Sequence, residues 1–131
     1  MLRVPSRLPD DLETLIHQTI GCCITVHRAL GPGLLEAIYA RAVCIELDAQ
    51  GIGFETEKPY PILYRGQLLC HQRLDFVIAA QLVLEIKAVE RVDPVHRAQL
   101  LSYLRGSKLR VGLLVNFNVT VLQDGLKRVV L

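Results

Sequence analysis

The sequence predicts an α/β fold in which helices pack on the faces of one mixed β-sheet. Two segments with helical apolar spacing open the chain, at about 10–30 and 34–50. Two strand-like apolar runs, 76–78 and 82–86, are separated by a short break, which predicts a hairpin. A further helical segment leads to the apolar run 111–115, so the predicted order is α-α-β-β-β-α-β with a short β tail.

The two N-terminal helices are predicted from capping residues and apolar stripes. The first is expected to begin at Pro9-Asp10-Asp11 with an aspartate as N-cap and to end at Gly31-Pro32-Gly33. Its stripe is Leu12, Leu15, Ile16, Thr19, Cys22, Cys23, Val26, Ala29 and Leu30. The second helix has two apolar stripes, which predicts burial on more than one side. One stripe is Leu35, Ile38, Ala42, Ile45 and Ala49, and the other is Glu36, Tyr39, Val43 and Leu47.

Glu36 is predicted to face inward on the second helix, which is unusual for a carboxylate. Two interpretations follow. In the structural one, Glu36 occupies the third helical position, where an acid caps the backbone and favours the helix dipole. In the functional one, the inward carboxylate belongs to a site.

The strands and the last helix follow from turn and breaker residues. Residues 54–64 are predicted to form a strand at an edge of the sheet or with an irregular course, because two prolines interrupt their hydrogen bonding. Arg65-Gly66 is a turn to the next strand at 68–78, and 82–87 is the third. Asp93-Pro94 is expected to start a helix that Gly106 ends. The expected tail strands are 119–122 and 129–131.

Composition indicates one domain, residues 1–131, that is large enough to bury a core. No apolar run approaches the roughly 20 residues that span a bilayer, and the N-terminus lacks the apolar core of a signal peptide. We therefore expect a cytoplasmic protein with no membrane partner. The net charge of +2 is too small to indicate nucleic-acid binding by itself. The four cysteines lack C-x-x-C spacing, which favours buried free thiols over a zinc or iron–sulfur site.

A polar group stands out on the hairpin. Strand alternation places Asp75 on one face of its strand and Glu85 with Lys87 on one face of the next, so the hairpin can bring the three together. The spacing D-x(9)-E-x-K is weak alone, since Glu85 and Lys87 also fit an exposed salt bridge. Gathered carboxylates repel one another unless a cation intervenes, and hard oxygen ligands suit Mg²⁺ or Mn²⁺. The chemistry indicated is metal-assisted phosphodiester hydrolysis, with an ammonium orienting the water.

The run G-P-G-L-L-E-A-I-Y contains Gly33, Glu36 and Tyr39, and it resembles the signature of the GxxExxY protein family, a compact branch of the PD-(D/E)XK nuclease superfamily. Further stretches resemble the same family and cover almost the whole chain from Asp11. They are V-H-R-A-L-G-P-G from Val26, R-L-D at 73–75, L-E-I-K-A-V at 84–89, P-V-H-R-A-Q-L-L-S-Y at 94–103 and G-L-L-V-N-F at 112–117. The chain departs from the pattern in lacking a proline before Asp75 and in having Asn118 where glycine is usual.

The resemblance implies a restriction-endonuclease-like mixed β-sheet core flanked by helices. It implies Asp75, Glu85 and Lys87 as the catalytic set. Metal would be held by Glu36, Asp75, Glu85 and the carbonyl of Ile86. Gln99 and Tyr103 match a Q-x-x-x-Y element that supports the site and contacts substrate in some of these nucleases. Tyr39 and Arg73 are further candidates for substrate binding or support.

The resulting hypothesis is an Mg²⁺- or Mn²⁺-dependent nuclease acting on DNA, with RNA as the less favoured alternative substrate. One alternative is a non-catalytic nucleic-acid-binding or assembly module that retains the nuclease fold, and another is a phosphohydrolase of small nucleotides. A homodimer or a protein partner stays open. His27 is expected to be a hydrogen-bonded helix residue or else to support a metal site, and His71 is a weaker candidate for phosphate contact.

Overall fold

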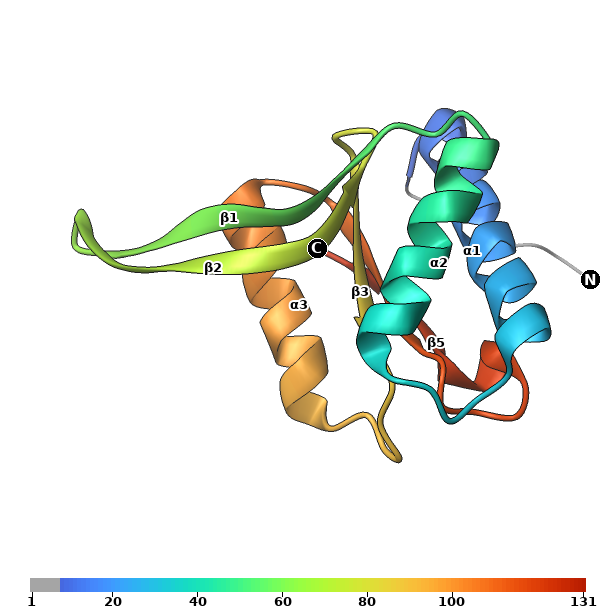
Figure 1. Cartoon of the computed structure of the whole chain (residues 1–131). Coiled ribbons are helices and arrows are strands. Elements are labelled where there is room, and N and C mark those ends of the chain that lie inside the picture. The colour runs from blue at the N-terminus through green and yellow to red at the C-terminus, as the bar shows by residue number, and fades with distance from the viewer. Residues whose placement is uncertain (1–7) are drawn as a thin grey trace, which may run out of the picture.

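Helices cover both faces of a five-stranded sheet in this computed structural model, which describes residues 8–131 (Figure 1). The chain begins with two helices, α1 (Asp10–Leu30) and α2 (Glu36–Ala49). Three antiparallel strands follow: β1 (Phe54–Tyr64), β2 (Gln67–Ile78) and β3 (Leu82–Lys87). The helix α3 (Pro94–Ser107) then crosses over to β4 (Val111–Asn116), and the chain ends with β5 (Leu126–Val130).

The strands lie in the order β1-β2-β3-β4-β5, and only β3 and β4 run parallel. Because α3 connects these two parallel strands, it is the crossover helix that the sequence predicts. The predicted α/β class, the mixed sheet and the order α-α-β-β-β-α-β are confirmed.

Two apolar clusters hold the layers together. On one face of the sheet, α1 and α2 bury residues such as Ile16 and Val43 against Leu84. On the other face, α3 buries Leu100 and Leu104 together with residues of β3 and β4. All six residues of β4 are buried, as expected for a strand covered on both faces. Each fully buried leucine contributes about 1.5–3 kcal/mol through removal of its surface from water.

The start of each N-terminal helix differs from the prediction. Pro9, rather than an aspartate, is the N-cap of α1, although Asp10 and Asp11 lie in its first turn. Glu36 is the first helical residue of α2, not the third, and the N-cap Leu35 makes no side-chain cap hydrogen bond. The acids still lie where they interact favourably with the helix dipoles.

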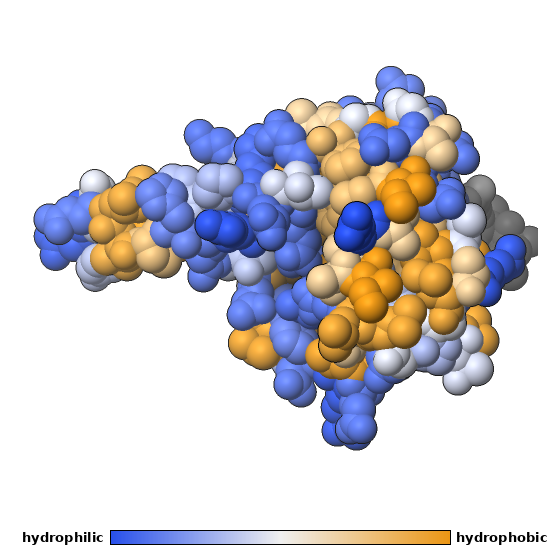
Figure 2. Space-filling view, in the orientation of Figure 1, coloured by the Kyte–Doolittle hydropathy of each residue, from blue (hydrophilic) through white to orange (hydrophobic). Residues whose placement is uncertain are grey.

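The helix α2 is buried along one stripe only, so the predicted burial on several sides is wrong. Tyr39, Val43 and Leu47 are completely buried, whereas Leu35 is 74% exposed and Ile45 is 66% exposed. The helix packs on α1 and the sheet with one face, and no other described element covers the opposite side. Figure 2 shows the resulting apolar area on the face of the molecule where α2 lies.

The C-terminal region also differs in detail. The predicted strand 119–122 is absent: residues 119–121 are irregular and the 3-10 helix η1 (Leu122–Gly125) begins at Leu122. β5 starts at Leu126 rather than at 129. A Cβ atom added at Gly125 would collide with the backbone of Asn116, so this turn packs directly on β4. Gly106 does not end α3, because the helix continues to Ser107 and its C-cap Lys108 is left-handed.

The cysteines are all free, but not all buried. Cys22 and Cys23 are buried and Cys44 is half-buried, whereas Cys70 is exposed on β2. The prediction fails for Cys70 because this part of β2 projects from the core. No helix among residues 8–131 combines the length and apolarity needed to cross a membrane. Residues 1–7 lie outside the described part of the chain, so the expectation that the N-terminus is not a signal peptide stays a prediction.

Candidate active site

The candidate site lies where β2 separates from β3. The two strands pair only at Phe76↔Leu84, Val77↔Val83 and Ile78↔Leu82. Before Phe76, β2 pairs with β1 alone, while β3 continues beside β4 to Lys87. We call this divergence the fork. It leaves one side of the end of β3 without a neighbouring strand.

Asp75 and Glu85 face each other across the fork. The Asp75 N–H donates to Glu85 Oε1 at 3.2 Å, and the Ile86 N–H donates to Asp75 Oδ2 at 3.0 Å. The two carboxylates therefore accept backbone hydrogen bonds where the regular ladder stops. Glu85 is 5% exposed and Asp75 is half-buried. The structure thus brings together the two acids that the sequence singled out.

The acids meet at the edge of the fork rather than on one flat face of the sheet. Leu74 and Val77 both pack in the α3-side cluster, although residues three apart on a regular strand point to opposite faces. Strand alternation therefore breaks between them, at Asp75. Phe76 packs on the α1–α2 side, and Asp75 shares a cavity with it there. The simple hairpin geometry expected from the sequence needs this correction.

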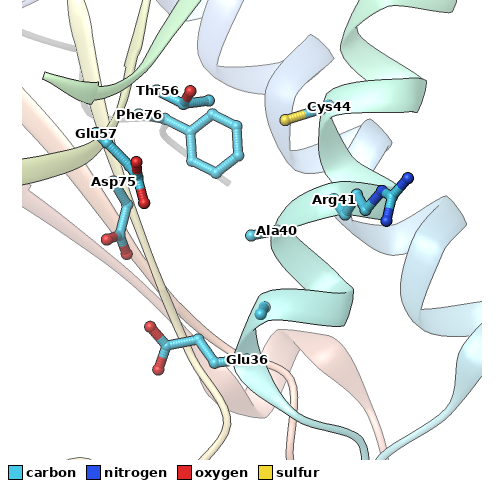
Figure 3. Close-up of a pocket in the computed structure, with 9 residues that line it drawn as sticks. Glu36, Ala40, Arg41, Cys44, Thr56, Glu57, Asp75 and Phe76 are labelled. Carbon is cyan, nitrogen blue, oxygen red and sulfur yellow. The ribbon is translucent and has the colours of Figure 1, made fainter.

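That cavity has a volume of about 570 Å³ and lies between α2 and the first two strands. Its polar lining includes Glu36 and Arg41 from α2, Glu57 from β1 and Asp75 from β2. In Figure 3 the Glu36 carboxylate extends from α2 toward Asp75, whereas Arg41 points away from both. The cavity is therefore the open approach to the fork, with Glu36 on the wall opposite Asp75. Glu36 is exposed, so the predicted inward position of this carboxylate is wrong: it faces the cavity and not the core.

The charged groups of the site change one another's pKa values. Burial, followed by the charge of Asp75, raises the pKa of Glu85 to about 9, and Lys87 opposes this shift. Burial also raises the pKa of Glu36; Lys87 and His96 lower it and Asp75 raises it. Lys87 is thus an electrostatic neighbour of two of the acids. The site holds more carboxylates than its own ammonium neutralises.

Tyr103 approaches the same acids from α3. Burial and then the nearby Glu85 raise the pKa of its hydroxyl to about 12, with smaller contributions from Tyr60 and Asp75. Its ring meets the edge of Tyr60 at 5.4 Å. Gln99 lies one turn earlier on the helix and is exposed. Arg73 is exposed on β2, two residues from Asp75.

Tyr39 holds the loop before α2. Its hydroxyl donates to the Gly31 carbonyl at 2.6 Å and accepts the Leu34 N–H at 3.1 Å, and its ring stacks on Phe117 at 4.6 Å. Gly33 in this loop has φ +97°, which favours glycine. Tyr39 is completely buried, and its hydrogen bonds hold the loop that leads to Glu36 at the start of α2.

Two residues near the site were given no role from the sequence, although Asn116 lies in the stretch G-L-L-V-N-F that resembles the family. Glu57 lies on β1 between Thr56 and Lys58, which pair with Phe76 and Leu74, so it is level with Asp75 on β2. It lines the cavity and has φ +50°, a conformation that is unusual outside glycine. Asn116 is buried at the end of β4, where its side chain accepts the Val89 N–H at 3.1 Å and donates to the Val89 carbonyl at 2.8 Å. It fixes the segment that follows Lys87.

The histidines lie apart from the pair Asp75 and Glu85, although His96 is close enough to Glu36 to lower its pKa. His27 is buried and its Nε2 lies 2.8 Å from the Val119 carbonyl, so it is a hydrogen-bonded helix residue and not part of the site. His71 is exposed and pairs with Pro61, away from the acids. His96 accepts the Asp93 N–H through Nδ1 at 3.2 Å at the start of α3.

The carboxylates of the site are suitable ligands for a hard cation, but they do not form a complete coordination shell. Within residues 8–131, no three His, Cys, Asp or Glu side chains are gathered as a ready metal site. Asp75 and Glu85 are paired, and Glu36 stands on the opposite wall of the cavity. A divalent cation would offset the repulsion and burial that raise the pKa of Glu85, and carboxylate oxygens are its preferred ligands.

Comparison with known proteins gives one family. A family model described as the PD-(D/E)XK nuclease superfamily matches residues 13–129 of the 131-residue chain. No curated protein and no solved structure gives a significant match.

Proposed function

We propose that this chain, which belongs to the PD-(D/E)XK nuclease superfamily, is a divalent-metal-dependent nuclease that hydrolyses phosphodiester bonds of DNA. The observation that carries the proposal is the pair of acids at the fork. Asp75 and the buried Glu85 are joined through backbone hydrogen bonds, and Lys87 follows two residues later on the same strand. Burying a carboxylate beside a second one destabilises the folded state, so such a pair is expected at a functional site that uses the charges.

The acids would hold Mg²⁺ or Mn²⁺. Asp75 and Glu85 supply the first carboxylates, and Glu36 faces them across the cavity. The N–H and C=O of one strand residue point to the same side, and the Ile86 N–H points to Asp75, so the Ile86 carbonyl also faces the fork. When bound, the ion would polarise the phosphate and lower the pKa of a water molecule.

The remaining side chains would act on water and substrate. Lys87 would orient the attacking water, because its ammonium lies within electrostatic reach of Glu85 and Glu36. Tyr103 would form a wall of the site through its hydroxyl near Glu85, with Gln99 beside it for substrate contact. Arg73 would meet the phosphate backbone just outside the fork.

Within the superfamily, we assign the chain to the GxxExxY branch as one domain. Supporting this, the three signature residues cooperate in one turn: Gly33 adopts a positive φ, Tyr39 ties the loop, and Glu36 begins α2 at the cavity.

The test is cleavage of single- and double-stranded DNA and of RNA by the purified protein with Mn²⁺ or Mg²⁺. Lys87→Ala, prepared identically, is the matched variant, and circular dichroism verifies its fold. We expect cleavage by the wild type and a loss of at least about a hundredfold in the variant. Equal cleavage by both proteins would identify a contaminant. Metal-independent binding of nucleic acid without cleavage would instead support the non-catalytic binding module.

A further inference from the structure

Beyond the fork, the first two strands continue as a two-stranded ribbon. It comprises residues 58–74, with the turn at Arg65-Gly66, and it is paired to the rest of the sheet only at its base. Figure 1 shows it projecting from the body of the molecule. A ribbon of this kind is marginal on its own, so its sequence is expected to serve a partner.

One face of the ribbon is open. Tyr60 on the opposite face packs against α3, where a Cβ atom added at Gly106 would lie 2.6 Å from the Tyr60 ring. Pairing in the ladder places the following residues on the open face: Pro59 with Arg73, Pro61 with His71, and Leu63 with Leu68. Leu63 and Leu68 are 58% and 54% exposed. We call this surface the free face.

Charge is segregated along the ribbon. From Lys58 to Leu74 the sequence contains Lys58, Arg65 and Arg73 and no acid. Lys58 pairs with Glu55 at the base, at 3.3 Å, which leaves the two arginines as the cations of the free ribbon. Acids occur immediately below it, at Glu57 and Asp75. The ribbon is thus cationic up to the point where the carboxylates of the site begin.

These features match the groove of a nucleic-acid duplex. The major groove of B-form DNA admits a two-stranded β-ribbon, whereas the major groove of A-form RNA is too narrow and deep. Asp75 follows Gly66 by nine positions, a span of about 30 Å that corresponds to about nine base pairs. The exposed leucines near the tip can contact thymine methyl groups on the groove floor. Figure 2 shows this apolar band near the end of the projection.

We propose that the ribbon seats double-stranded DNA by entering its major groove, with Arg65 and Arg73 on phosphates and the adjoining backbone held at the fork. The proposal rests on the proposed nuclease function and specifies its substrate as a B-form duplex. Because the ribbon runs directly into the fork, its acid-free cationic segment ends at Asp75, the first carboxylate of the site.

The test is fluorescence anisotropy of the full-length protein in EDTA, where binding is measured without cleavage. The probes are a labelled 20-base-pair DNA duplex, the matching RNA duplex and the single strand. The variant is Arg65→Ala/Arg73→Ala, and the matched control is Arg28→Ala/Lys127→Ala, which removes two exposed cations from α1 and β5. We expect the DNA duplex to bind most tightly. The ribbon variant should lose about tenfold in affinity and reduce the slope of log K against log salt by about 1.8, while the control changes neither.

Several results would overturn the proposal. Unchanged duplex affinity and salt slope in the ribbon variant would remove the ribbon from the interface. RNA duplex binding as tightly as DNA would exclude the major groove. If sedimentation shows a dimer that Leu68→Lys dissociates while DNA binding is unaffected, the ribbon serves a second copy of the chain. Cleavage with Mn²⁺ is measured separately: ribbon-dependent binding without cleavage contradicts the nuclease proposal alone, and cleavage with ribbon-independent binding contradicts only this one.

Discussion

Burial of Glu85 beside Asp75 ties the stability of the metal-free protein to pH. The pKa of Glu85 is raised from 4.5 to about 9, so the folded state holds this proton more tightly than the unfolded chain. The stabilisation is therefore fully present below about pH 4.5 and is lost as the pH rises toward about 9. In EDTA, we expect the free energy of unfolding of Glu85→Gln to exceed that of the wild type by more than about 1 kcal/mol at pH 8. Urea titrations at pH 5 and pH 8 measure it; a difference that does not grow with pH would contradict the assignment.

Asp75 is the residue whose loss separates metal binding from folding. In Asp75→Asn, an amide oxygen can still accept the Ile86 N–H, so the fork keeps its hydrogen bond and the protein folds. The variant lacks the carboxylate that a hard cation requires. We expect Mn²⁺ to stabilise the wild type, by about 2.7 kcal/mol at a hundred times its Kd, and to leave the variant unchanged. Titration calorimetry with Mn²⁺ gives the affinities directly, and equal affinities would remove Asp75 from the metal site.

Individual site residues were predictable to the extent that local spacing decides them. The predicted hairpin placed Asp75 near Glu85, although alternation breaks at Asp75, and helical spacing placed Gln99 one turn from Tyr103. Glu57 and Asn116 were missed because their roles depend on contacts with distant segments, namely the cavity and Val89. Spacing alone does not distinguish Glu57 from an ordinary strand acid, and Asn116 lies in a stretch that resembles the family without a role that the sequence could assign.

At the scale of elements, the absence of a side chain at Gly106 lets α3 pack closely on Tyr60 of β1. Alanine favours a helix over glycine, so Gly106→Ala would normally stabilise. Here the added methyl group meets the Tyr60 ring at 2.6 Å, and we expect a net destabilisation of about 1–3 kcal/mol. Gly21→Ala is the control, because Gly21 lies inside α1 with no atom within 4 Å of an added Cβ, and it should gain about 0.5–1 kcal/mol. Chemical denaturation compares the two; a stabilising Gly106→Ala would mean that α3 and the ribbon are not packed as described.

The sequence predicted which segments are helices and strands better than it predicted their tertiary contacts. Periodicity identified α2, but an apolar stripe cannot tell whether a neighbour covers it, and Ile38 and Ile45 proved exposed. Valine-rich segments near the end were predicted as strands, yet 119–122 is irregular and η1 follows, because the Gly125 turn packs on β4. Both errors arise where tertiary contacts override local preference.

At the scale of the molecule, the sequence predicted the order of elements and the mixed sheet but not the fork. β2 leaves β3 after only three pairs because Asp75 and Glu85 replace the ladder hydrogen bonds. The break creates both the candidate site and the projecting ribbon, so the functional geometry follows from an irregularity that alternation alone does not contain.

Thiol reactivity tests this division between packed body and projecting ribbon. Burial raises the pKa of Cys23 to about 12 and also raises the pKa values of Cys22 and Cys44, so these thiols are weakly nucleophilic as well as shielded. Cys70 is exposed on the ribbon. At pH 8 we expect one fast equivalent of thiol reaction with Ellman's reagent, lost in Cys70→Ser, and a slower reaction at half-buried Cys44. Cys22 and Cys23 should react at the rate of opening of the α1–sheet layer, and all four thiols should react at once in guanidinium chloride. Fast labelling of Cys23 in the native protein would contradict the packing of α1, and slow labelling of Cys70 would show that the ribbon is covered in solution.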